Sequence, residues 1–102
     1  MKTTDFKIEL LSDNMTNGKT VKKGDFLNCK KLSDFNFHNG RVHSLKDLDG
    51  NIYIRRVEIA EDFIYLKCDN PKYEKFNLKY TPETIQQDFT EIALVHSYDR
   101  IL

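Results

Sequence analysis

The sequence is poor in the residues that mark several common classes of protein. It has no tryptophan, two prolines, two cysteines and four glycines among its 102 residues. No apolar run approaches the roughly 18 residues of a membrane-spanning helix. Lysine plus arginine equals aspartate plus glutamate, at sixteen each, so the formal net charge is zero. This balance argues against a dedicated nucleic-acid binder and a polybasic membrane module, because both depend on excess cationic charge.

Metal and disulfide chemistry have little support in the sequence. Cys29 and Cys68 are far apart and neither belongs to a CxxC pair, and His38, His43 and His96 show no metal-ligand spacing. The first residues lead into a charged alternating segment and lack the apolar stretch of a signal peptide, so we expect a cytoplasmic protein. We therefore expect reduced core thiols, surface imidazoles, no metal and no cofactor.

Short apolar segments separated by frequent turn residues predict an all-β fold. With 39% hydrophobic and 12% aromatic residues, the chain has enough apolar surface for a modest core. Thr81 followed by Pro82 is typical of a helix start, so one short helical turn is expected near 81–89. We expect a single domain of mostly antiparallel strands over residues 1–102. The expected strands cover 6–10, 26–32, 41–45, 52–59, 63–68 and 92–98.

One expected strand changes the parity of its apolar residues. Ile52 and Ile54 share one parity, whereas Val57 has the other, and the change falls at Arg55 and Arg56. A strand with a period of two cannot change its buried face without a bulge, a twist or a move between sheets. Two interpretations remain open: a local distortion at the arginine pair, or a strand buried on both faces with two arginines at its rim.

Seven segments, taken in order, resemble the LexA/CI-type repressor peptidase domain, which has a signal-peptidase-like fold. They include a strand ending in a Ser-Asp-Asn-Met turn, a later Arg-Arg pair and a Cys-Asp-Asn-Pro-Lys-Tyr motif. In full they are residues 6–11, 12–15, 24–27, 40–43, 52–57, 68–73 and 91–95. The resemblance covers nearly the whole chain, and it rests on the order and spacing of pieces that are weak individually.

The resemblance implies a site whose two catalytic positions are altered. The family uses a serine nucleophile and a buried neutral lysine as general base. Here the nucleophile position is Asn14, whose amide cannot form an acyl-enzyme, and the base position is Arg55, whose guanidinium stays protonated. We therefore expect no catalytic residues and no enzymatic activity, with Ser12 as the fallback nucleophile.

By the same resemblance, the domain is expected to act through protein–protein association or extended-peptide binding in transcriptional, SOS or phage regulation. Asn14, Met15, Arg55 and Arg56 would line the peptide cleft. The expected partner is a protein, either a second copy of the chain or an intact LexA-like repressor. We expect no DNA-binding helix-turn-helix, no membrane contact and no nucleic-acid partner.

Two other functions are kept as alternatives. In the first, Ser12 replaces the missing nucleophile of a self-cleaving serine peptidase, because side chains two residues apart on a strand share a face. In the second, the chain is a small β-barrel that binds single-stranded nucleic acid, with Phe35, Phe37 or Tyr53 stacking on bases beside the lysine-rich N-terminal third. Alternating aromatics are more typical of a core.

Overall fold

A computed structural model describes residues 5–11, 15 and 22–99 of the chain. The described residues form seven strands, one 3₁₀-helix and one α-helix. The strands are β1 (Asp5–Glu9), β2 (Phe26–Leu32), β3 (Val42–Asp47), β4 (Ile52–Ala60), β5 (Phe63–Lys67), β6 (Leu78–Tyr80) and β7 (Phe89–Asp99). The helices are η1 (Pro71–Phe76) and α1 (Pro82–Asp88). The all-β prediction is confirmed, whereas η1 and β6 were not expected.

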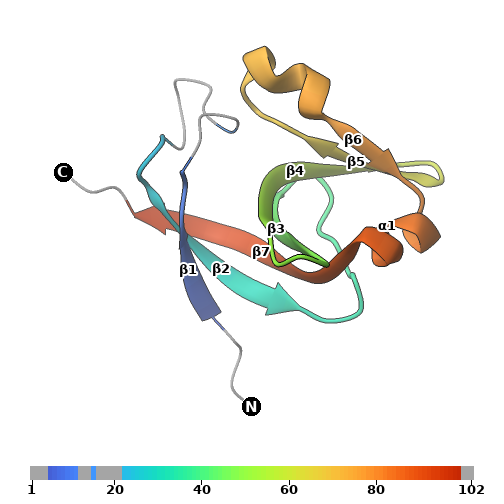
Figure 1. The fold of residues 1–102 in the computed structure, drawn as a ribbon, viewed down its shortest axis with the longest axis horizontal. Coiled ribbons are helices and arrows are strands. Elements are labelled where there is room, and N and C mark those ends of the chain that lie inside the picture. The colour runs from blue at the N-terminus through green and yellow to red at the C-terminus, as the bar shows by residue number, and fades with distance from the viewer. Residues whose placement is uncertain (1–4, 12–14, 16–21, 100–102) are drawn as a thin grey trace.

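All described strands belong to one antiparallel sheet in the order β1-β2-β7-β3-β4-β5-β6. The long last strand, β7, pairs with β2 on one side and β3 on the other. In Figure 1, β7 runs across the molecule from α1 at one end to the region of β1 and β2 at the other. Because neighbouring strands alternate in direction, β1, β7 and β4 all run the same way.

Local turn chemistry explains the tight connection between β3 and β4. The Asp47 carboxylate accepts hydrogen bonds from the backbone N–H groups of Asp49 and Asn51, at 2.9 and 2.8 Å. Gly50 has a φ of 86°, which L residues rarely adopt. A tight hairpin turn therefore connects the two strands that were expected over 41–45 and 52–59.

The short helix α1 begins where its sequence predicts. The Thr81 side chain accepts from the Thr84 backbone N–H and the Thr84 hydroxyl accepts from the Thr81 N–H, which makes a reciprocal cap. Pro82 occupies the first turn, where its missing N–H costs no hydrogen bond. Ile85 is the buried residue of α1 and anchors it to the sheet.

Two groups of apolar side chains form the core, so the curled sheet is buried on both faces. The first core cluster holds Leu45, Val57, Ile64, Leu66, Ile85, Phe89 and Ile92. The second holds Leu10, Met15, Leu27, Cys29, Ile54 and Ala93. Phe35 and Phe37 are partly buried against the first cluster, as expected for core aromatics.

Strand β4 separates the two clusters. Ile54 packs in the second cluster and Val57 in the first. The pairing register of β4 with β3 is continuous through Arg55 and Arg56, and β5 begins to pair with β4 at Arg56, so there is no bulge at the arginine pair. The strand is buried on both faces, but Arg55 is itself buried at 8% exposure and does not lie at the rim.

Irregular pairing occurs instead on β7, at two places. The register shifts between Asn28 and Cys29 of β2, which lie opposite Ser97 and Val95, so His96 is the extra residue of a bulge. A second register shift occurs in the pairing of β7 with β3, where Lys46 and Asp47 lie opposite Glu91 and Phe89. The β7 bulges bend the longest strand of the sheet.

The cysteine thiols are placed as expected, but one of the histidines is not. Cys29 and Cys68 are buried free thiols, as expected. Burial raises the pKa of the Cys29 thiol to about 11, partly offset by a hydrogen bond with Ser44. The expectation of surface imidazoles is wrong for His43, which is fully buried, because its ring nitrogens find backbone partners inside the protein.

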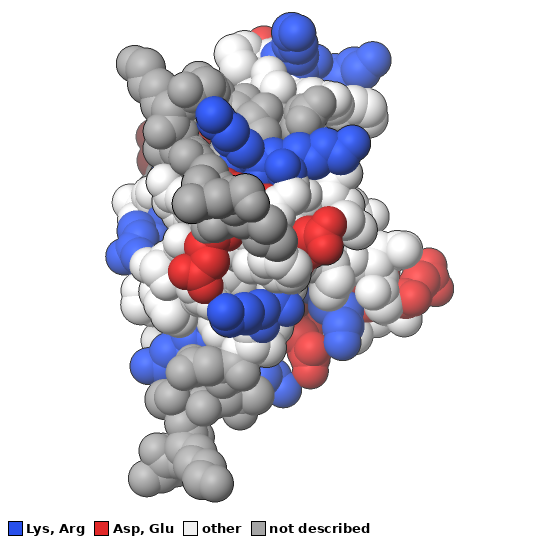
Figure 2. All heavy atoms as spheres, turned by 90° about the vertical axis from the view of Figure 1, so that its left-hand side faces the viewer, with Lys and Arg blue, Asp and Glu red and all other residues white. Residues whose placement is uncertain are grey.

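The surface carries charges of both signs. On the face in Figure 2, basic and acidic side chains are interspersed over most of the area, with basic ones gathering toward the upper end. Neither helix in the described part of the chain has the length and apolar character needed to span a bilayer.

Candidate functional site

A groove lies between β1 and β4, two strands that do not pair with each other. One part is a hollow of about 610 Å³, lined by residues 7–11 on one side and 52–55 on the other. Consecutive residues of both parities line it, so the hollow runs along the edges of the two strands and not over one face. The groove follows from the topology, because β1 is the edge of the sheet and β5 pairs with β4 only from Arg56 onward.

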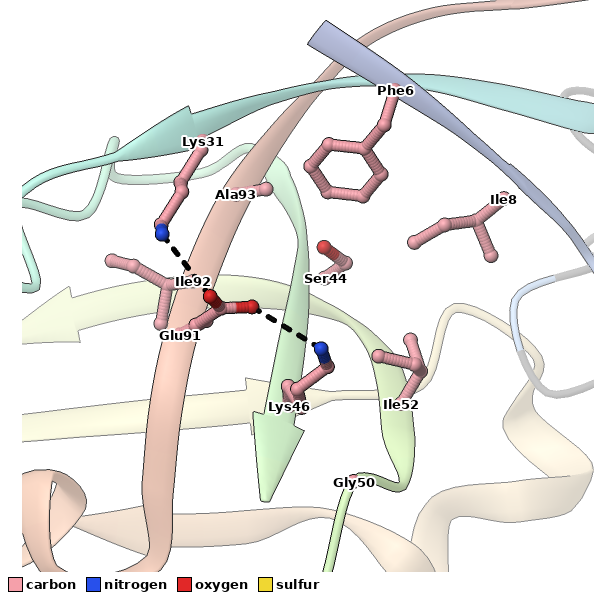
Figure 3. Close-up of a pocket in the computed structure, with 10 residues that line it drawn as sticks. All are labelled: Phe6, Ile8, Lys31, Ser44, Lys46, Gly50, Ile52, Glu91, Ile92 and Ala93. Carbon is pink, nitrogen blue, oxygen red and sulfur yellow. Dashed lines mark hydrogen bonds and ion pairs between the residues drawn. The ribbon is translucent and has the colours of Figure 1, made fainter. Parts of the chain in front are cut away.

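A second hollow of about 530 Å³ continues the first and shares Ile8 and Ile52 with it. We call the two together the β1–β4 groove. In Figure 3, Phe6 and Ile8 of β1 lie on one side of this part and Ile52 on the other, and Ala93 of β7 also lines it. Phe6 and Ile52 are 38% and 44% exposed, so the groove presents apolar surface to its occupant.

An ion-pair network lies beside this apolar surface, at the rim of the second hollow. Glu91 of β7 pairs with Lys31 of β2 at 3.1 Å and with Lys46 of β3 at 3.4 Å (Figure 3). The hydrogen bonds from the two ammonium groups lower the pKa of the Glu91 carboxyl. The two lysines exceed the one glutamate, so this rim is positively charged.

Arg55 lines the β1–β4 groove. Its Nη1 donates to the Ile54 carbonyl at 2.9 Å, and its guanidinium carbon lies 5.5 Å from the centre of the Tyr53 ring. Its Nε is buried and has no hydrogen-bond acceptor among the described residues. A buried charge of this kind is costly unless something pairs with it.

Arg56 is held differently and lies outside the groove. Its Nε and Nη2 donate to the two Asp69 carboxylate oxygens at 2.8 and 2.7 Å, and its Nη1 donates to the Gly40 carbonyl at 2.8 Å. The carboxylate and its charge raise the pKa of Arg56. Such a bidentate pair fixes the guanidinium geometry.

The predicted site residues are therefore only partly brought together. Ser12 and Asn14 lie outside the described residues. Met15 is fully buried in the second core cluster, and its sulfur accepts a 3.4 Å hydrogen bond from the Asp69 backbone N–H. Its side chain therefore belongs to the core. Among the described members of the predicted set, Arg55 is the one that lines the β1–β4 groove.

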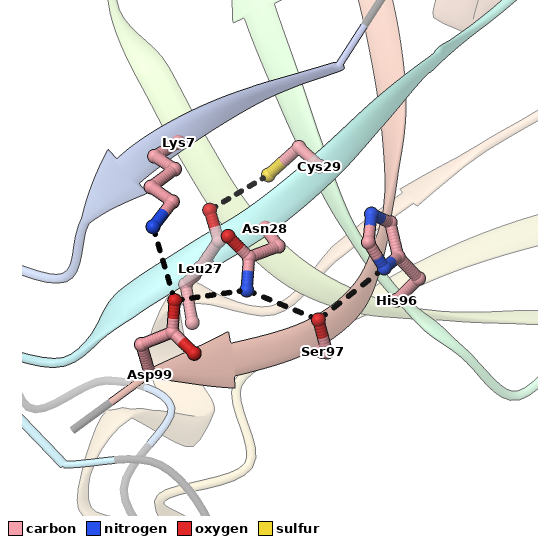
Figure 4. Close-up of polar contacts among 7 residues, drawn as sticks. All are labelled: Lys7, Leu27, Asn28, Cys29, His96, Ser97 and Asp99. Atoms are coloured by element: carbon pink, nitrogen blue, oxygen red, sulfur yellow. Dashed lines mark hydrogen bonds and ion pairs between the residues drawn. The ribbon is translucent and has the colours of Figure 1, made fainter. Parts of the chain in front are cut away.

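The structure adds a polar network that the sequence did not indicate (Figure 4). Asn28 of β2 donates to Ser97 at 3.0 Å and to Asp99 at 3.3 Å, and Lys7 of β1 donates to the same Asp99 oxygen at 3.1 Å. The His96 bulge sets which β7 side chains face Asn28, and neither residue spacing nor composition signals that register. The network ties β1 to the end of β7.

No group of three or more His, Cys, Asp or Glu side chains in the described ranges is placed to hold a metal ion. In comparisons with known proteins, a family model described as Peptidase S24-like matches residues 1–95. No curated protein matches the chain significantly.

Proposed function

Because the chain belongs to the Peptidase S24-like family, a LexA- or phage-repressor-like group, we propose that it binds an extended polypeptide segment without cleaving it. The bound segment comes from a partner protein or from a second copy of the chain. The β1–β4 groove is the observation that carries this proposal.

The groove suits an extended backbone because it lies between two strand edges. An extended segment rises about 3.3 Å per residue, so a groove lined by residues 7–11 and 52–55 matches about four or five residues. Main-chain hydrogen bonds along a strand edge give affinity in this mode of recognition, and side-chain pockets give specificity. The apolar surface around Ile8 and Ile52 supplies such a pocket.

The absence of hydrolysis is proposed from the chemistry of Arg55, Cys29 and Asn14. A guanidinium does not release its proton at neutral pH, so Arg55 cannot act as a general base. The Cys29 thiol, with its pKa raised to about 11 by burial, is not a nucleophile at neutral pH. At the nucleophile position, Asn14 has an amide in place of a hydroxyl.

Peptide binding is tested with pools of fluorescent seven-residue peptides. The peptides are acetylated and amidated, rich in β-forming residues, and randomised around a fixed central residue. We expect saturable binding by fluorescence anisotropy. Ile52→Lys should weaken it at least about tenfold by placing a charge in the apolar groove. Leu48→Lys is the matched control, because Leu48 is 70% exposed in the adjacent turn and lines neither part of the groove.

Hydrolysis is tested on the same mixtures. Mass spectrometry after incubation should recover every bound peptide intact, and a fluorophosphonate probe should leave the protein unlabelled. Cleaved peptides, or a label on Ser12, would support the displaced-nucleophile peptidase instead. Light scattering during size exclusion shows whether a second copy serves as the partner. Failure of every pool to bind, together with a strict monomer, would contradict the proposed function.

A further inference from the structure

Arg56 shows how a guanidinium of β4 can have a hydrogen-bond partner at each of its three nitrogens. One side of the group, formed by Nε and Nη2, holds both oxygens of the Asp69 carboxylate. The remaining nitrogen, Nη1, donates to the backbone carbonyl of Gly40. In this arrangement the planar guanidinium binds a carboxylate through two parallel hydrogen bonds on one side and a backbone carbonyl through Nη1.

The neighbouring Arg55 has half of this arrangement. Its Nη1 donates to a backbone carbonyl, that of Ile54, at 2.9 Å. On the Nε and Nη2 side no described residue supplies a carboxylate, and Nε is buried without an acceptor in the part of the chain that the structure describes. The Arg55 residue as a whole is only 8% exposed, so bulk water replaces that acceptor poorly.

The positive charge of Arg55 is also uncompensated by its described neighbours. None of the five ion pairs between described residues includes it. His43, its cross-strand partner on β3, carries no negative charge in either protonation state. The Tyr53 ring, 5.5 Å away, gives a cation–π contact, which offsets only a small part of the cost of burying an unpaired ion.

We propose that the Nε and Nη2 side of Arg55 binds the side-chain carboxylate of an aspartate or glutamate in the segment that occupies the β1–β4 groove. This inference rests on the proposed peptide binding and specifies its preferred ligand. A segment between the two strand edges places its backbone in the plane of the sheet and its side chains on the two faces. Arg55 and Tyr53 are two residues apart on β4, so their side chains lie on the same face of the sheet. A side chain of the bound segment that lies on this face, opposite Arg55, would contact the guanidinium.

The test compares acidic and amide residues at the centre of the peptide pools. With the wild-type protein, pools with central Asp or Glu should bind at least about tenfold more tightly than pools with Asn or Gln, because a hydrogen bond to a charged group is worth about 1.5–3 kcal/mol. In Arg55→Met, which keeps the apolar stem, the preference should fall to nearly one. Arg41→Met is the matched control, since Arg41 is exposed and lines neither part of the groove.

The possible results distinguish a failure of the carboxylate site at Arg55 from a failure of peptide binding in the groove. Equal binding of acidic and amide pools, or a preference that survives Arg55→Met, overturns the carboxylate site while peptide binding stands. Tight binding of pools made without the C-terminal amide, and not of the amidated pools, also overturns it, because the ligand is then a chain end. Failure of all pools, together with a strict monomer, contradicts the proposed function itself.

A measurement on the wild-type protein covers the case in which Arg55→Met does not fold. The Arg55 Nε resonance, followed in ¹⁵N-labelled protein, should shift on addition of the central-Asp pool and stay in place with the central-Asn pool. An unmoved Nε resonance at saturating central-Asp peptide contradicts the proposal without any substitution.

Discussion

His43 shows how one buried residue makes the domain sensitive to acid. A carbonyl oxygen only accepts hydrogen bonds, so the 2.9 Å contact with the Arg41 carbonyl places the ring proton on Nδ1. Nε2 then accepts from the His38 backbone N–H at 3.1 Å. The neutral ring is thus fully satisfied, whereas a protonated Nε2 would point its hydrogen at another donor. Burial accordingly lowers the pKa of His43 from 6.5 to about 4.

The first prediction concerns pH and the free energy of unfolding. The unfolded chain takes up a proton on this histidine below about pH 6.5 and the folded chain does so only near 4, so stability is present above 6.5 and is lost as the pH falls. Between pH 7.5 and 5 the loss should be about 2 kcal/mol. Urea denaturation at a series of pH values measures it.

The matched variants isolate this histidine from the carboxylates that also titrate in acid. In His43→Gln the stability at pH 7.5 should be lower, because backbone partners are lost, but the slope between pH 7.5 and 5 should nearly vanish. His96→Gln, at an exposed position of β7, should keep the wild-type slope. A wild-type slope in His43→Gln would show that another group causes the acid sensitivity.

At the scale of elements, α1 depends on its cap because it is short. A helix of seven residues has few internal hydrogen bonds, so the reciprocal contacts of Thr81 and Thr84 matter more than in a long helix. Thr81→Ala should cost about 1 kcal/mol of unfolding free energy, while Thr81→Ser, which keeps the oxygen, should cost less than half of that. Thermal denaturation of both variants checks this, and equal losses would mean that the methyl group and not the cap is important.

Elements with a clear local signal were predicted from the sequence. The alternation of apolar and charged residues in β1 and the Thr81-Pro82 start of α1 both depend on residues that are neighbours in the chain. β6 was missed because Leu78–Tyr80 is only three residues long, too short for a period to show. η1 was missed because a 3₁₀-helix with no buried residue has no amphipathic pattern.

The candidate site was less predictable than the family. The resemblance to the LexA/CI-type domain is confirmed, and it directed attention to Arg55. The surroundings of that side chain depend on which distant strands meet, since β1 and β4 are more than forty residues apart in the sequence. The burial of Met15 and the role of Glu91 between two lysines likewise follow from tertiary pairing, which single-sequence patterns do not encode.

At the scale of the whole molecule, charge balance determines how the protein meets polyanions. Sixteen basic and sixteen acidic side chains give no long-range attraction to phosphate. A labelled single-stranded 20-mer should therefore show no measurable binding by anisotropy at about 150 mM salt, and only weak binding at about 50 mM. Micromolar or tighter binding with a steep salt dependence would revive the nucleic-acid alternative, and alanine at Phe35 or Tyr53 would then locate it.

β1 and β4 run in the same direction, and this has a thermodynamic consequence. A segment that enters the groove antiparallel to one of these strands is antiparallel to the other as well, so it can hydrogen-bond to both without a mismatch in strand polarity. It would join the free edge of β1 to the part of β4 that β5 leaves unpaired, so that β1, β2, β7, β3 and β4 form a closed ring with the segment and both exposed edges are covered. Occupancy of the groove should therefore raise the melting temperature of the domain with increasing ligand concentration. Peptide capture and fold stability would be two measurements of a single equilibrium.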